Sequence, residues 1–278
     1  EYLSKIVKPD IGIITNIGNS HLEKLKNVEG VFKVKSELIK NIRKGGTLIV
    51  PNDEKFLHRW KKMANGIKVL PVPEKFIAAN EKILSTKKIM TFDIIENIAD
   101  KKKPKIIPIS SSLLGRHNIQ NILVCFTCLN DLRESASMMH KSLKNMSSSI
   151  SRQQIFSWKN KSILIDDTYN ANPESVKRSL DVLSEFSGRK IFIFGDMFEL
   201  GRFRKKHHID VGSYAYKAKI DQLITFGELS KLASKRFQKK SYNFNDEQEL
   251  KEFLVNFIKK NDIVLIKGSR GMKMERFI

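Results

Sequence analysis

The run Ile163–Asp166 is typical of a buried strand that ends in a carboxylate, and Asp167 follows it directly. A polar loop, Tyr169–Asn172, comes next, and Pro173 then stands where proline is favoured, in the first turn of a helix. Because ligands of open α/β sheets bind at the carboxyl ends of strands, this strand, loop and helix predict a binding site. An ordinary loop that ends in the helix cap Asn172 would use the same residues.

Glycine and polar residues also follow three later apolar runs, at Gly195-Asp196, at Gly227 and at Lys267–Arg270. Side chains at the carboxyl ends of parallel strands meet at one edge of the sheet, so we expect these groups to converge on a single crevice. The alternative is that Gly and Asp are simply favoured in turns.

The elements that must position these groups alternate between strand and helix after a serine-rich segment at 147–151. This alternation predicts a mostly parallel sheet with helices on both faces. The expected strands are Ile163–Asp166, Lys190–Phe194, Gln222–Phe226 and Ile263–Lys267. The expected helices are Glu174–Phe186, Lys206–Ala218, Ser230–Phe237 and Glu247–Lys259.

The first half of the chain also predicts an α/β fold, with antiparallel strands in addition. Strands are expected at Ile11–Thr15, Thr47–Val50, Ile67–Val72, Met90–Ile95 and Ile106–Ile109. Helices are expected at Val28–Ile42, Phe56–Met63, Ile119–Leu132 and Ser135–Met146, with a loop at Leu113–Asn118. We place the domain boundary in the serine-rich segment, which divides the chain into 1–149 and 150–278.

The chain of 278 residues carries 51 Lys and Arg against 30 Asp and Glu, a net charge of +21. Such a charge attracts polyanions, but the lysine clusters are dispersed and lack interleaved aromatic residues, so a basic nucleic-acid-binding protein is only an alternative. No apolar run of about 18 residues occurs, so we expect neither a membrane span nor a signal peptide. Cys125 and Cys128 favour packing in a helix core over metal binding, and a reducing cytoplasm fits best.

Five phrases occur in the order PDIGIITNIGNSHLE, LLGRHNIQN, LIDDTYNANPES, GDMFELG and KGSRGMKME, from Pro9 to Glu275. In this order they resemble the Mur ligases, and most closely the type that joins D-Ala-D-Ala to UDP-MurNAc-tripeptide. The resemblance implies a partial central ATPase domain followed by a Rossmann-like C-terminal domain that binds the incoming amino-acid substrate. The alternative within this superfamily is another Mur or folylpolyglutamate-type ligase.

The reaction that this resemblance implies begins when ATP phosphorylates a substrate carboxylate. The amine of D-Ala-D-Ala then attacks the acyl phosphate and phosphate leaves. The family motifs imply Mg²⁺ ligation by His21 and by Lys35 as a carbamate, with Glu23 as a further candidate; His21 and Lys35 are also the catalytic candidates. They imply ATP binding by Asn118, Asn121, His117, Arg152, Asp167, Tyr169 and Asn170, and substrate binding by Asn16, Asn172, Lys267, Ser269 and Arg270.

Several features depart from the family pattern. No Walker A loop, G-x-x-G-K-[ST], occurs in these residues, and the chain opens on Glu1 rather than Met. Leu114 and Ser151 stand where the family usually has Pro and Gly, and Gly201–His208 is unusually basic. We therefore expect a fragment of a monomeric ligase that is inactive without its missing N-terminal portion.

Overall fold

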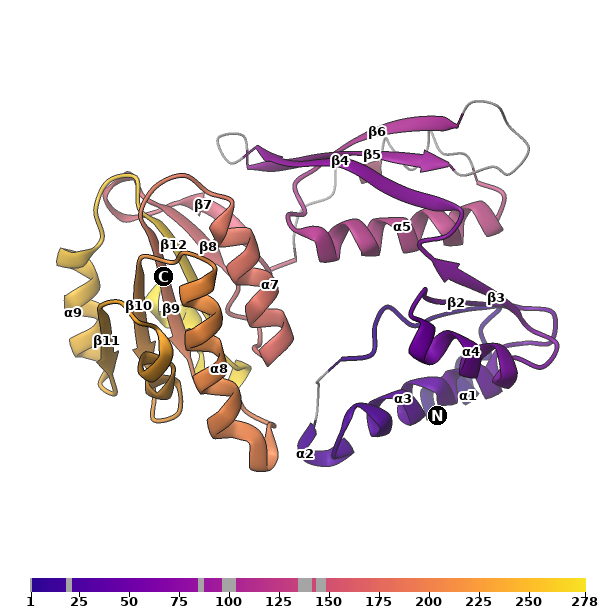
Figure 1. Ribbon diagram of the computed structural model, residues 1–278, viewed down its shortest axis with the longest axis horizontal. Helices are drawn as coiled ribbons and strands as arrows, with labels where there is room; N and C mark the ends of the chain where they lie inside the picture. The colour runs from indigo at the N-terminus through magenta and orange to yellow at the C-terminus, as the bar shows by residue number, and fades with distance from the viewer. Residues whose placement is uncertain (1, 19–21, 85–87, 97–103, 135–141, 144–148) are drawn as a thin grey trace.

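The computed structural model describes residues 2–18, 22–84, 88–96, 104–134, 142–143 and 149–278. The fold is α/β, as the sequence predicts. The first half of the chain carries a parallel and an antiparallel sheet, and the second half carries one larger sheet (Figure 1).

The parallel sheet of the first half has the order β1-β2-β3, formed by Ile11–Ile13, Thr47–Pro51 and Lys68–Val72. The helices of this region are α1 (Tyr2–Val7), α2 (Leu22–Leu25), α3 (Val28–Ser36) and α4 (Glu54–Met63). Phe32 of α3 stacks on Phe56 of α4 with ring centroids 5.0 Å apart. The expected helix to Ile42 was too long, because α3 ends at Ser36 and a 3₁₀ turn, η1 (Glu37–Asn41), follows it.

The antiparallel sheet consists of β4 (Phe76–Leu84), β5 (Ile89–Glu96) and β6 (Lys105–Ser111). It packs on α5 (Arg116–Asp131), where the Phe76 and Phe126 rings meet edge to face at 5.9 Å. The expectation that both cysteines lie in a helix core was wrong for Cys125, which is on the exposed side of α5. Cys128 is half-buried against the core.

The second half forms a six-stranded sheet with the order β11-β10-β9-β12-β8-β7. All neighbouring pairs are parallel except β7 with β8. The strands are β7 (Gln154–Ser157), β8 (Ile163–Asp166), β9 (Lys190–Gly195), β10 (Gln222–Phe226), β11 (Ser241–Phe244) and β12 (Ile263–Lys267). The edge strands β7 and β11 were not predicted, since each is a four-residue segment with little apolar patterning.

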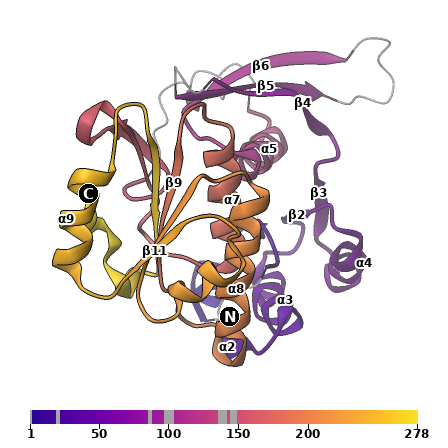
Figure 2. The same cartoon turned by 60° about the vertical axis from the view of Figure 1, so that its left-hand side comes forward.

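Helices cover both faces of this sheet, as expected (Figure 2). On one face, α7 (Pro173–Ser184) and α8 (Arg204–Lys217) pack on Phe192 and Leu265, while α9 (Glu247–Phe257) packs on Ile193 on the other. Successive side chains of a strand point to opposite faces of the sheet, so they enter the two different cores. The expected helix at Ser230–Phe237 is instead the 3₁₀ segment η5 (Ser230–Arg236).

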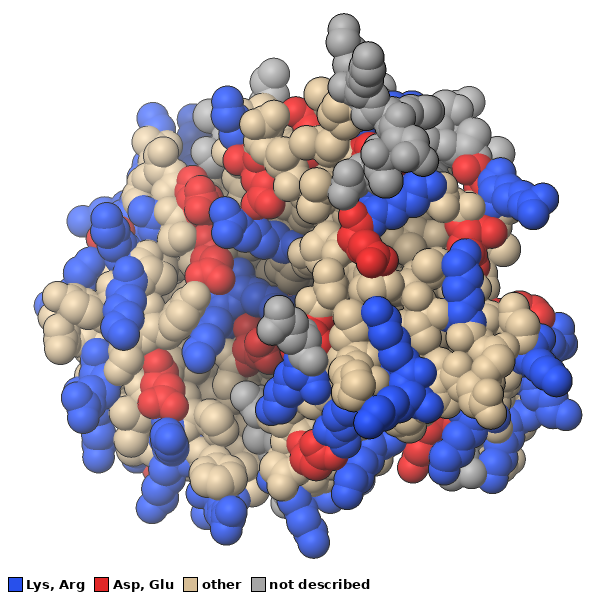
Figure 3. Space-filling model, turned by 45° about the vertical axis from the view of Figure 1, so that its right-hand side comes forward, with Lys and Arg blue, Asp and Glu red and all other residues tan. Residues whose placement is uncertain are grey.

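Three further observations complete the fold. Most of the predicted helix Ser135–Met146 lies outside the described residues, with only 142–143 described as helical. Within the described part of the chain, no helix is long and apolar enough to cross a membrane. Lys and Arg are spread over the visible face and interspersed with Asp and Glu (Figure 3), so the positive charge forms no single stripe on that face.

Candidate functional site

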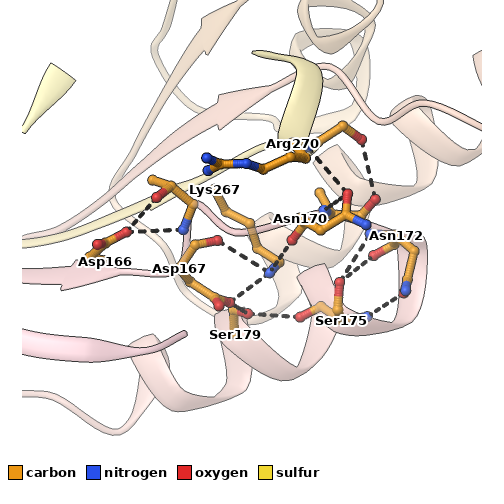
Figure 4. Close-up of polar contacts among 11 residues, drawn as sticks. Asp166, Asp167, Asn170, Asn172, Ser175, Ser179, Lys267 and Arg270 are labelled. Carbon is orange, nitrogen blue, oxygen red and sulfur yellow. Dashed lines mark hydrogen bonds and ion pairs between the residues drawn. The ribbon is translucent and has the colours of Figure 1, made fainter. Parts of the chain in front are cut away.

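Of the four predicted groups, those that follow β8 and β12 meet in a hydrogen-bonded network centred on Lys267, at the end of β12 (Figure 4). The expectation of one crevice was wrong for Asp196 and Gly227, which line neither cavity described below, because the Asp196 carboxylate accepts from the Leu229 and Ser230 amides. Its Nζ donates to Asp167 Oδ2 at 2.6 Å and to the Asn170 carbonyl at 2.9 Å. Ser179 of α7 donates from Oγ to the same Asp167 oxygen at 2.5 Å. The network ties the ends of β8 and β12 to the loop between β8 and α7.

The polar loop is held in one conformation by its own side chains. Asp166 Oδ1 accepts from the Thr168 amide at 3.0 Å and from the Thr168 hydroxyl at 2.7 Å. Asn172 caps α7, since its Oδ1 accepts from the Ser175 amide at 2.8 Å and its own amide donates to Ser175 Oγ at 3.0 Å. The capping interpretation of Asn172 is therefore correct, and a preformed loop needs little ordering when a ligand binds.

A cavity of about 480 Å³ lies between this loop and the N-terminal turn of α5. It brings together all seven residues that the sequence assigned to ATP, and Asn172 and Lys267 also line it. The residues of this cavity, called here the nucleotide cavity, come from both halves of the chain. They include His117, Asn118, Asn121, Arg152, Gln153, Asp167, Tyr169, Asn170, Asn172, Ser175, Arg178, Ser179 and Lys267.

Arg152 and Tyr169 form one wall of the nucleotide cavity. The guanidinium carbon of Arg152 lies 4.2 Å from the centre of the Tyr169 ring, which is 47% exposed. The Tyr169 amide donates to the Ser151 carbonyl at 3.0 Å, so the segment before β7 is attached to the loop. Ser151 has a φ of +56°, the left-handed region that glycine adopts readily, which explains the family's usual Gly at this position.

The opposite wall is the first turn of α5. Asn118 donates from Nδ2 to the Leu114 carbonyl at 2.8 Å and accepts from Asn121 Nδ2 at 3.3 Å. Asn118 is not the helix cap that the sequence allowed, because α5 begins at Arg116 and Gly115 is its N-cap. Burial, with a smaller effect of the nearby Arg178 cation, lowers the pKa of His117 to about 4, so this imidazole is neutral at pH 7.

A second cavity, of about 320 Å³, adjoins the first and contains Asn16; we call it the Asn16 cavity. Lys35 of α3 donates from Nζ to the Asn16 carbonyl at 2.9 Å and to its Oδ1 at 3.1 Å. Burial lowers the pKa of Lys35, which increases the fraction of neutral amine. His117, Asn121 and Arg178 line both cavities, so the two are neighbours.

Comparison with known proteins assigns both halves of the chain. The family model described as the Mur ligase middle domain matches residues 1–129, and that of the Mur ligase glutamate ligase domain matches residues 151–270. The chain belongs to the Mur ligase family. This confirms the resemblance inferred from the five sequence phrases.

Among curated Mur ligases, the chain is 30% identical over 276 residues to the UDP-N-acetylmuramoyl-tripeptide–D-alanyl-D-alanine ligase of Buchnera aphidicola subsp. Baizongia pistaciae. It is also 30% identical to the enzyme of the same name from Haemophilus influenzae. The alignments cover 99% and 100% of this chain but only 59% and 60% of those relatives. A crystal structure of MurF from Acinetobacter baumannii matches with a TM-score of 0.89 and 27% identity, over 99% of this chain and 60% of that one.

Four predicted residues of this Mur ligase lie elsewhere or cannot be placed. Ser269 is 3% exposed, lines neither cavity and accepts from the Phe198 amide at 2.7 Å, so its hydroxyl serves to hold two loops together. Arg270 also lies outside both cavities and pairs with Glu275 at 3.0 Å. His21 lies outside the described residues, and the side chain of Glu23 is not described.

Among the three predicted metal ligands, the structure describes the side chain of Lys35. The part of the chain that the structure describes holds no group of three or more His, Cys, Asp or Glu side chains arranged for a metal ion. Lys35 lies beside Asn16, whose amide oxygen is a donor of the kind that Mg²⁺ prefers.

Sequence reasoning missed Arg178, Ser175 and Ser179, which line the nucleotide cavity. A signal for them was present, because positions three and four apart share one face of a helix. Counting from the cap Asn172, that spacing selects Ser175 and Ser179, and Arg178 lies beside them on the same face.

Proposed function

We propose that residues 1–149 and 150–278 are the central and C-terminal domains of an ATP-dependent ligase that adds D-Ala-D-Ala to UDP-MurNAc-tripeptide. The main support for this proposal is that all seven residues assigned to ATP from the sequence line one cavity between the two halves. The named activity of the curated relatives supports the choice of substrates.

The nucleotide cavity suits ATP in its size and donor set. Asn118 and Asn121 offer amide donors and acceptors for the edge of an adenine ring. Arg152 offers the parallel N–H donors of its planar guanidinium to phosphate oxygens. Its packing against Tyr169 already restricts the side chain, so binding costs less conformational entropy. Asp167, held by Lys267 and Ser179, is the candidate for the ribose hydroxyls.

The Asn16 cavity is our candidate for the reacting carboxylate and its metal ions. When bound, Mg²⁺ would neutralise charge on the transferring phosphate. Lys35 would hold it as a carbamate, because the carbamate supplies the oxygen atoms that this hard cation prefers. The lowered pKa of Lys35 favours this modification, since CO₂ adds to a neutral amine.

The two halves would act by bringing both substrates into one space. A ligand bound between the loop after β8 and the first turn of α5 touches both halves and excludes water from the acyl phosphate. The amine of D-Ala-D-Ala must then approach the acyl carbon within a few ångströms. We place its carboxylate near the loop at Lys267–Arg270, where Arg270 is the outward cation.

The experiment is a phosphate-release assay on the full-length gene product that contains these 278 residues. We expect release that requires UDP-MurNAc-tripeptide, ATP and D-Ala-D-Ala together. Lys35→Ala should abolish most turnover, whereas Lys33→Ala, an exposed lysine of the same helix, should retain it. Equal release with L-Ala, meso-diaminopimelate or glutamate as the amine would overturn the choice of substrate, and full activity of Lys35→Ala would overturn its role.

A further inference from the structure

Arg178 of α7 lies where three cavities meet. It lines the nucleotide cavity, the Asn16 cavity and a third cavity of about 740 Å³ between β4, α5 and α7. Its helix belongs to the second half of the chain and faces α5 of the first half (Figure 1). Arg178 is therefore a cation that the second half presents to the cavity of Asn16 in the first.

The guanidinium of Arg178 is weakly held by its own helix. Its ion pair with Glu174, one turn earlier, is 3.9 Å long, and the two side chains are 37% and 46% exposed. Pairs of this kind contribute little to stability, so the structural role of Arg178 is small. Glu174 itself lies against the first half, because a Cβ at Gly18 would be 2.6 Å from its Oε2.

The positive charge of Arg178 already acts on the cavities that it lines. It is one of the causes that lower the pKa of His117, after burial. His117 is neutral at pH 7 and does not compete with Arg178 for an anion. Among the described residues, Arg178 is the one Lys or Arg side chain that lines the Asn16 cavity, so the positive charge there does not depend on the state of Lys35.

In the proposed reaction, a phosphoryl group passes from the nucleotide to a carboxylate in the neighbouring cavity. The transferring group carries its negative charge across the junction between the two cavities. An arginine at that junction offers two parallel N–H donors to phosphate oxygens, which a lysine does not. Charge placed there beforehand stabilises the transition state without reorganisation.

We propose that Arg178 binds the terminal phosphates of ATP at the junction of the nucleotide and Asn16 cavities, as a second phosphate-binding arginine beside Arg152. This inference rests on the proposed function. It adds a contact made from α7, so a bound ATP would join α7 of the second half to α5 of the first.

The test compares ATP with adenosine, which lacks phosphates, in the full-length gene product. Dissociation constants in the presence of Mg²⁺ are measured by titration calorimetry for wild type, Arg178→Gln and Arg178→Lys. We expect Arg178→Gln to weaken ATP binding roughly 10- to 100-fold and to leave adenosine binding within about twofold. Arg178→Lys should recover only part of the loss, because it restores the charge without the fork.

Lys177→Ala is the matched control, since Lys177 is the exposed neighbour on α7, lines none of the three cavities and lies over Tyr214. It removes the same charge from the helix and should leave ATP binding within about twofold. Three results would overturn the inference: equal falls in the affinities for ATP and adenosine, an equal fall in ATP affinity in Lys177→Ala, or a fall only in the affinity for UDP-MurNAc-tripeptide. In each case, phosphate release by the wild type would still uphold the proposed function. Absence of both ATP binding and phosphate release in the wild type would overturn both.

Discussion

Lys267 and Asp167 form a buried ion pair in which Nζ lies 2.6 Å from Oδ2 and the side chains are 3% and 10% exposed. The pair joins two neighbouring parallel strands at the edge where ligands of such sheets bind. The Asn170 carbonyl and Ser179 hydroxyl complete its hydrogen bonds, so neither charge is left isolated. Lys267 therefore stabilises the conformation of the loop after β8, independently of any ligand that the loop binds.

We predict that Lys267→Met lowers the free energy of unfolding by about 3–5 kcal/mol, because it leaves the Asp167 carboxylate buried and unpaired. The double variant Lys267→Met with Asp167→Asn should recover much of this loss. Urea denaturation measures both, and Lys260→Met, at an exposed position, is the control. A double variant no more stable than the single one would contradict the pairing.

Asn172 offers a way to separate folding from ligand binding. Asn172→Ala removes the cap of α7 and should cost about 1 kcal/mol of stability. Asn172→Asp keeps an oxygen acceptor for the Ser175 amide and places negative charge at the helix N-terminus, so it should fold like wild type. If the Asn172 amide group also binds substrate, Asn172→Asp will weaken substrate binding while the thermal stability stays unchanged. Equal stability of Asn172→Ala and Asn172→Asp would show that the cap contributes little.

The strands that carry the site were predictable, and the reason is their burial. Ile163–Asp166 and Ile263–Lys267 have the bounds expected from their apolar runs, because strands in the middle of a sheet are buried on both faces. The edge strand Ser241–Phe244 lacks that signal, since its side chains are half-buried or exposed. The 3₁₀ segments were taken for α-helix because their apolar spacing is almost the same over two turns.

The candidate site was predictable from motifs but not from periodicity. The family pattern selected residues of the nucleotide cavity that lie more than a hundred positions apart in the chain, such as Lys267 and Asn118. It did not select Arg178, which only the meeting of α7 with α5 brings into the cavities. Nor did it indicate that Ser269 would be buried behind the loop, because burial depends on packing between segments far apart in sequence.

The buried histidines predict a loss of stability in acid. Burial lowers the pKa of His208, whose Nε2 accepts from the Met197 amide at 2.9 Å, and lowers the pKa of His117 to about 4. The unfolded chain takes up protons below about pH 6.5 while the folded chain does not, so the free energy of unfolding falls as the pH falls. His117 alone accounts for up to about 3 kcal/mol between pH 6.5 and 4.

Urea titrations at pH 7 and pH 4.5 measure this effect. His117→Gln should reduce the difference between the two pH values, because glutamine does not titrate. A wild-type protein as stable at pH 4.5 as at pH 7 would contradict the assignment of neutral buried imidazoles.

Gly115, the N-cap of α5, lies close to Val182 of α7 in the other half of the chain. Its φ is +91°, and a Cβ there would lie 2.8 Å from both His117 Cε1 and Val182 Cγ2, the latter on α7 of the other half. Its ψ is 149°, a backbone conformation adopted essentially by glycine alone, so Gly115→Ala adds a steric clash to a backbone penalty of about 1–3 kcal/mol. Gly45→Ala is the matched control, since Gly45 has a φ of +80° and nothing within 4 Å of the added carbon. We expect Gly115→Ala to lower the free energy of unfolding in urea more than Gly45→Ala does, which should show only the backbone penalty. Gly115→Ala should also weaken ATP binding, because the nucleotide cavity needs α5 and α7 together. Equal effects of the two substitutions would mean that the contact with Val182 is not needed.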